Sequence, residues 1–171
     1  ASMSRPCPAG GVRGRRERRS VEGSRENPSG EEAVTAWERH NGVVPRSDSP
    51  YRVAFVCTGN ICRSPMAEIV FRDFAERAGL GSHVVSTSSG TGDWHVGERA
   101  DVRTIEALHR RGYDGERHRA RQFTLEDFDR NDLIVALDRS HERILSSWAR
   151  TPDDADKLAL LMAFDETAGG T

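Results

Sequence analysis

Short apolar runs alternate with amphipathic segments along the chain from Tyr51 onward. The first run, Arg52–Val56, is apolar and β-favouring, which predicts a buried strand that ends at Cys57. This rhythm predicts an α/β fold with three α/β/α layers around a central, parallel, four-stranded sheet. The other predicted elements are strands near His83–Thr87 and at Leu133–Leu137, helices at Asp101–Arg111 and Ser140–Trp148, and an apolar run at Leu158–Met162.

A short polar loop joins the first strand to the first helix. Gly59 and Asn60 break the strand, and asparagine tolerates the left-handed backbone that a tight loop needs. Ser64 before Pro65 predicts a helix start capped by the serine hydroxyl, and Gly79 ends that helix. Since ligands of parallel sheets bind outside the carboxyl ends of the strands, this loop is the expected site. The apolar positions at helical spacing are Met66, Ile69, Val70 and Phe74.

Residues 1–50 differ in composition from the rest of the chain. They are rich in Arg, Glu, Ser, Gly and Pro, and Trp37 is their only aromatic residue. Such a segment cannot bury enough apolar surface to offset the entropy of ordering. We therefore predict a disordered extension over residues 1–50, of unknown role, and a single folded domain over residues 51–171.

Charge and cysteine content exclude several classes of function. The formal net charge of −2 provides no overall basic field, so nucleic acid is not an expected partner. Neither a membrane-spanning run nor a signal peptide is present, which predicts a cytoplasmic location without membrane binding. Cys7, Cys57 and Cys62 are too few for a disulfide scaffold and lack zinc-ligand spacing. We therefore expect reactive thiols, no metal and no cofactor.

The loop from Cys57 to Ser64 has the chemistry of a phosphate site. Backbone N–H groups that wrap toward a helix N-terminus favour anions, and for the same reason they favour a thiolate at Cys57. Arg63 carries a planar fork of donors that can hold two phosphoryl oxygens. Cys62 could trap an oxidised Cys57 as a disulfide. The loop residues predicted to bind substrate are Thr58, Gly59, Asn60, Ile61, Cys62 and Ser64.

A lone cysteine after a strand is more often a small buried apolar residue, and Cys-X5-Arg alone is common. Here strand, Cys57, Gly59, Asn60, Arg63 and the helix start occur in order, which favours the functional interpretation.

At these residues the sequence resembles the low-molecular-weight protein tyrosine phosphatases of actinobacterial type. The motif reads Val56-Cys-Thr-Gly-Asn-Ile-Cys-Arg-Ser-Pro-Met-Ala-Glu68, and the likeness continues to about Phe164. The resemblance implies Cys57 as nucleophile, Arg63 as phosphate clamp and Trp94 in the wall around a phosphotyrosine ring. It further implies that Ser64 donates a hydrogen bond to the thiolate, within a supporting network of Asn60, Ser64, Ser88 and His118.

The resemblance fails at the end of the sequence. The family's general acid lies in an Asp-Pro-Tyr-like motif before a last helix, whereas these residues contain no Asp-Pro dipeptide and stop at Thr171. Asp165 matches an earlier aspartate of the family, so the general acid stays unknown. The expectation is a domain that lacks its last helix and a phosphatase with impaired turnover.

Three functions are compatible with this loop. The first is hydrolysis of tyrosine-phosphorylated proteins or aryl phosphates through a phosphocysteine. The second is arsenate reduction on the same scaffold, although no cysteine follows Cys62 in the sequence to relay electrons. The third is a catalytically defective module that binds a phosphate-like anion.

Overall fold

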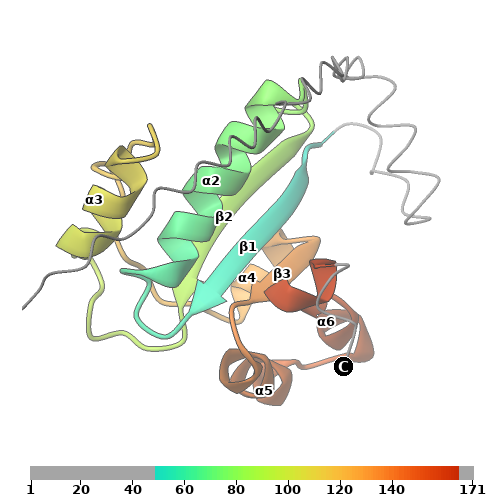
Figure 1. Cartoon of the computed structure of the whole chain (residues 1–171). Coiled ribbons are helices and arrows are strands. Elements are labelled where there is room, and N and C mark those ends of the chain that lie inside the picture. Colours follow the sequence, from blue (N-terminus) through green and yellow to red (C-terminus); the bar gives the residue numbers. More distant parts are fainter. Residues whose placement is uncertain (1–48, 166–171) are drawn as a thin grey trace, which may run out of the picture.

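The structure is a computed structural model that describes residues 49–165 (Figure 1). The predicted disorder of residues 1–50 falls almost entirely on residues 1–48, outside the described residues. In chain order the elements are β1 (Tyr51–Cys57), α2 (Arg63–Arg77), β2 (Val84–Gly90), α3 (Val102–His109), α4 (Glu126–Arg130), β3 (Leu133–Ala136), α5 (Arg139–Trp148), α6 (Pro152–Asp156), β4 (Leu158–Leu160) and the 3-10 helix η1 (Leu161–Phe164).

The strands form one four-stranded sheet in the order β2-β1-β3-β4, and every neighbouring pair is parallel. Helix α2 covers one face of this sheet, with α3 beside it, and α4 and α5 lie against the other face (Figure 1). The prediction of a three-layer α/β fold is therefore confirmed.

Alternate residues of β1 face the two helical layers on either side of the sheet. Val53 and Phe55 face α2, where the Phe55 and Phe71 rings lie 5.4 Å apart between centroids. Ala54 and Val56 face the opposite layer, which Leu145 of α5 helps to fill. Because β1 is buried on both faces, it reads as a continuous apolar run in the sequence.

Two details of the helices differ from prediction. Phe74, expected on the buried stripe of α2, is 61% exposed. Ala67 and Phe71, which lie four apart on one helical face, pack against the sheet, and Ala75 of the same row is buried, as is Ile69 of the predicted stripe. Helices α4 and α6 were not predicted, since five residues are too few for a helical period to emerge.

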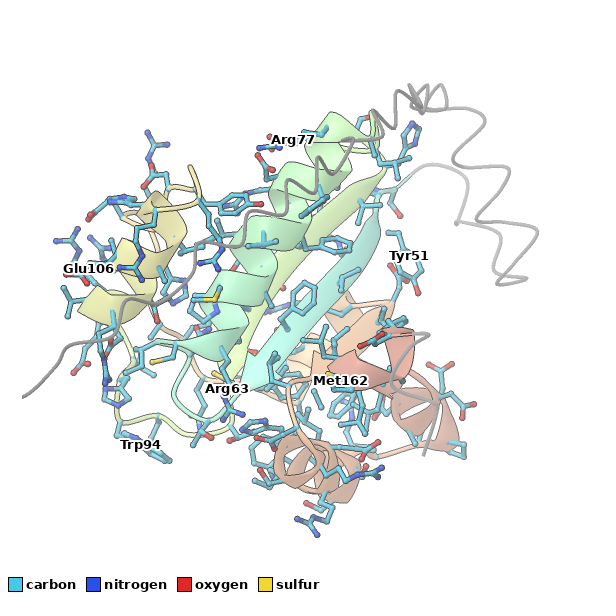
Figure 2. The ribbon with its side chains drawn as sticks, viewed as in Figure 1. Tyr51, Arg63, Arg77, Trp94, Glu106 and Met162 are labelled. Carbon is cyan, nitrogen blue, oxygen red and sulfur yellow. The ribbon has the colours of Figure 1, made fainter. Side chains whose placement is uncertain are left out.

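Three strand ends meet at the carboxyl edge of the sheet. Cys57 pairs in register with Gly90 at the end of β2, and Val56 pairs with Ala136, two residues before Asp138. Figure 2 shows Arg63 and Trp94 at this edge, with Tyr51 at the opposite one. Within residues 49–165, no helix has the length and apolar character to cross a membrane.

Candidate active site

The loop after β1 packs tightly against the end of β2. The backbone N–H of Thr91 donates to the Cys57 carbonyl at 2.8 Å, and that of Gly92 donates to the Thr58 carbonyl at 2.9 Å. A Cβ atom on Gly90 would lie 2.6 Å from the Thr58 carbonyl oxygen, closer than van der Waals contact permits. Glycine at position 90 therefore allows the two loops to approach.

The Cys57 thiol lies inside this loop and contacts a hydroxyl. Cys57 is 3% exposed, and its Sγ is 2.9 Å from Ser64 Oγ. Ser64 Oγ also accepts from the Asn60 side-chain amide and lies 3.2 Å from the Ser89 carbonyl. A hydroxyl has one hydrogen, so it can donate to the carbonyl beside a neutral thiol or turn to donate to a thiolate.

The position of Ser64 corrects one prediction. Helix α2 begins at Arg63, with Cys62 at the N-cap position and no side-chain cap. The hydroxyl expected to cap the helix is instead used inside the loop, beside Cys57. The hydroxyl therefore contacts Cys57 and does not cap the helix, although capping is the usual role of serine at such a position.

Asn60 organises the centre of the loop. It is fully buried, and among the described residues it is the only non-glycine residue with a positive φ, 54°. The predicted left-handed conformation is thus confirmed. Its side-chain amide donates to Ser64 Oγ and Ser88 Oγ, both at 2.9 Å, and its Oδ1 accepts from the Arg121 backbone N–H.

His118 and Ser88 complete the polar network around Asn60. His118 Nε2 lies 2.6 Å from the Asn60 carbonyl oxygen, and since a carbonyl only accepts, this ring nitrogen carries the proton. Ser88 Oγ donates to Glu68 Oε2 at 2.6 Å. The structure therefore brings together Asn60, Ser64, Ser88 and His118, and adds Glu68, which the sequence did not single out.

We predict that Asn60→Ala lowers the free energy of unfolding by about 2–4 kcal/mol. The change leaves the buried hydrogen-bond partners of Asn60 unsatisfied. It also places alanine in the left-handed backbone region, where its side chain cannot form the local hydrogen bonds that an asparagine can. Asn60→Gly loses the same side-chain hydrogen bonds, but glycine adopts the left-handed backbone conformation without strain. Urea unfolding of the three proteins should rank them parent, Gly, Ala. Equal stability of the Ala and Gly variants would contradict a backbone constraint at position 60.

Arg63 is held by an acidic residue from the end of β3. Its Nη1 donates to Asp138 Oδ2 at 2.6 Å, with the two side chains 52% and 38% exposed. Partial burial acts to raise the pKa of Asp138, but hydrogen bonds from Ser140, Arg63 and the His141 backbone hold it well below its usual range. The single contact occupies one nitrogen of Arg63, and a guanidinium offers five donor hydrogens.

Thr58 is held from the same side of the site. Its Oγ1 lies 2.8 Å from Nε2 of His141, a residue of α5 that is 1% exposed. Burial lowers the pKa of His141, as does Arg63, while Asp138 opposes the shift. The imidazole is therefore neutral at physiological pH.

The remaining predicted site residues line the rim. Trp94 is 64% exposed, which argues against a role in the core. Its ring lies against Gly92, where an added Cβ would come within 2.0 Å of it, and Gly92 is hydrogen-bonded to Thr58. Gly59 lies against the His95 ring in the same way. Ile61 accepts from the Asp101 backbone N–H, and Cys62 is a half-buried free thiol.

A family model described as "Low molecular weight phosphotyrosine protein phosphatase" matches residues 52–171. The chain belongs to this family. The low-molecular-weight protein-tyrosine-phosphatase of Streptomyces coelicolor is 56% identical over 120 residues, which cover 70% of this chain and 73% of that protein.

Solved structures of the phosphatase family share the fold. YfkJ from Bacillus subtilis superposes with a TM-score of 0.67 at 38% identity, covering 70% of this chain and 75% of that one. A mutant of the YwlE arginine phosphatase with a phosphorylated active-site serine gives a TM-score of 0.60 at 33% identity, covering 68% and 72%. Membership of this phosphatase family gives the chain a phosphate-ester substrate and a phosphate position in the loop.

Sequence reasoning missed the residues that hold this phosphatase loop from outside. Gly90 lies three residues beyond the predicted strand His83–Thr87 and was assigned no role, and Glu68 was recognised only as part of the motif. The sequence revealed neither the contact of Asp138 with Arg63 nor that of His141 with Thr58. No local pattern links Thr58 to a histidine 83 positions later.

Proposed function

We propose that this chain hydrolyses phosphotyrosine in proteins through a phosphocysteine on Cys57, with residues 51–171 as the phosphatase domain. The observation that carries the proposal is the placement of the Cys57 thiol beside Ser64, in a loop that ends at Arg63 and the N-terminus of α2. A helix N-terminus favours both the substrate phosphate and a thiolate.

The reaction has two steps. The Cys57 thiolate attacks phosphorus, so an S–P bond forms while the bond to the phenolic oxygen breaks, and the departing oxygen takes up a proton. Water then attacks the phosphocysteine, releasing inorganic phosphate and restoring the thiolate. Arg63 and the backbone N–H groups of residues 58–62 stabilise the charge on the three non-bridging oxygens in both steps.

Trp94 and Cys62 give the site two further properties. The exposed Trp94 ring supplies an aromatic wall, which suits an aryl ester better than arsenate alone. No cysteine lies among residues 63–171 to relay electrons in arsenate reduction. Cys62 instead serves as the redox partner that traps an oxidised Cys57 as a disulfide and protects it from further oxidation.

The 171 residues contain no Asp-Pro dipeptide, and the residue that protonates the leaving oxygen stays unassigned. General acid catalysis typically contributes about 10²-fold to 10⁴-fold, and it matters most for basic leaving groups. Tyrosine, with a pKa of about 10, is such a group. We therefore predict that, across a series of aryl phosphates assayed with this chain, kcat/KM falls steeply as the leaving-group pKa rises.

A phosphotyrosine peptide and a phosphoarginine peptide complete the substrate panel. The proposal expects faster hydrolysis of the phosphotyrosine peptide than of the phosphoarginine peptide. A burst of p-nitrophenolate from p-nitrophenyl phosphate, whose leaving group needs little protonation, would report the phosphocysteine. A kcat/KM that stays constant as the leaving-group pKa rises, but falls with that pKa in Asp165→Asn, would reveal an acid within these residues. Phosphate binding without any burst would favour the defective module, and faster phosphoarginine hydrolysis would overturn the substrate class. The cytoplasmic location stays a prediction from sequence.

A further inference from the structure

Both ends of the phosphate loop are tied to one helical turn outside it. Thr58, the residue after the nucleophile, contacts His141 through its hydroxyl. Arg63, the last residue of the loop motif, contacts Asp138. Asp138 is the N-cap of α5, where its Oδ1 accepts from the backbone N–H groups of Ser140 and His141 at 2.8 and 3.1 Å. A single capped turn therefore reaches the loop at two points.

We propose that the first turn of α5 is a positioning bracket for the phosphate loop, in which His141 fixes Thr58 and Asp138 fixes Arg63. The proposal rests on the phosphate site of the proposed function. Neither residue of the bracket has to touch the substrate. His141 acts through Thr58 and Asp138 acts through Arg63, and these two loop residues contact the substrate.

The protonation of His141 follows from its surroundings. Its Nδ1 lies 3.0 Å from Asp138 Oδ1 but makes no hydrogen bond. The negative charge of Asp138 at this distance favours a proton on Nδ1 over a lone pair even without hydrogen-bond alignment, so the proton belongs on Nδ1. Nε2 is then the acceptor, and the Thr58 hydroxyl donates to it.

This direction of the hydrogen bond gives Thr58 a fixed rotamer. A buried imidazole on a helix is a rigid acceptor, because α5 is packed on the sheet through Leu145. A threonine side chain held at its hydroxyl restrains the peptide groups on either side, including N–H donors proposed for the phosphate. Misplacement of about 1 Å can cost roughly 10²-fold in rate.

Asp138 restrains the orientation of the Arg63 side chain, as His141 restrains that of Thr58. It engages Nη1 alone, and among the described residues no protein group takes the Nε and Nη2 hydrogens. Those two nitrogens form one edge of the guanidinium, the edge suited to bidentate contact with a phosphoryl group. The bracket thus orients the arginine while it leaves the binding edge available.

The test uses His141→Leu, which removes the acceptor at similar volume, and His141→Gln, which restores an acceptor. Thr58→Val removes the donor, and Ser146→Ala, at an exposed position of α5, is the control. Affinity for inorganic phosphate is measured by calorimetry, and kcat/KM by hydrolysis of p-nitrophenyl phosphate, well below the unfolding temperature. We expect His141→Leu to weaken phosphate binding roughly 3-fold to 10-fold and to lower kcat/KM about 10-fold to 100-fold.

The glutamine variant should recover most of both losses, and the double variant Thr58→Val/His141→Leu should be no worse than the poorer single one. A His141→Leu protein with a lower Tm but unchanged phosphate affinity and kcat/KM would show a purely structural histidine and overturn the bracket. Additive effects of the two single changes would overturn it too. If the parent binds phosphate but hydrolyses no ester, the binding data still decide on the bracket, and only the proposed function fails.

Discussion

Cys57→Ser should lose phosphatase activity by a factor of roughly 10³ or more, as expected when the nucleophile of an enzyme is removed. The serine hydroxyl occupies nearly the same volume, but at neutral pH it is not ionised as a thiolate is, and no base adjoins it in the described site. The contact to Ser64 would still be geometrically possible. Initial rates on p-nitrophenyl phosphate and on a phosphotyrosine peptide measure the loss.

The same variant should still bind inorganic phosphate, because the backbone N–H groups and Arg63 remain in place. Phosphate affinity measured by calorimetry should stay within about tenfold of the parent value. Cys7→Ser, a matched change outside the described residues, serves as the control. Hydrolysis by Cys57→Ser within about 100-fold of the parent rate would remove Cys57 from the nucleophile role, whatever the phosphate affinity.

Arg63→Lys should lower kcat/KM on aryl phosphates by about 10²-fold to 10³-fold, the range found when one donor to a transition-state oxygen is removed. The ammonium group of lysine is a point charge, and it cannot contact Asp138 with one nitrogen while presenting a planar edge to the phosphate. Most of the loss should lie in kcat, because the arginine is expected to follow the phosphoryl oxygens as the transition state forms.

Arg77→Lys is the matched control for this change, since Arg77 lies in the last turn of the same helix and pairs with Asp73. Its kcat and KM should equal those of the parent. A kcat/KM for Arg63→Lys close to that of Arg77→Lys would refute the clamp, and a rise in KM alone would reassign Arg63 to ground-state binding.

Sequence periodicity predicted the parts of the fold that depend on local chemistry. Each long strand and helix was expected within a few residues of its observed bounds, because β1 is apolar from Val53 to Cys57 and Gly79 follows the end of α2 with a positive φ of 74°. The predicted start of α2 at Pro65 lies two residues from the observed start at Arg63, and the predicted cap was wrong. Ser64 has the residue type of a cap, but a residue type cannot tell whether a buried thiol competes for the hydroxyl.

The part of the site that could not be predicted from the sequence depends on tertiary contacts. Thr58 meets His141 across 83 positions, and Arg63 meets Asp138 across 75. These contacts exist because β1 and β3 are parallel neighbours, so that the residues after each strand end meet at one edge. A histidine on a helix carries no local sign of such a partner, and in a single sequence it reads as an ordinary surface residue.

The placement of the nucleophile on a strand between two parallel neighbours also determines when reactivity arises during folding. Cys57 is aligned with Gly90 only after β1 has paired with β2, and α5 reaches the loop only after β1 has paired with β3. Parallel pairings of this kind require long connections to close first, and they form slowly. Recovery of phosphatase activity during refolding should therefore report the pairing of β1 with both β2 and β3.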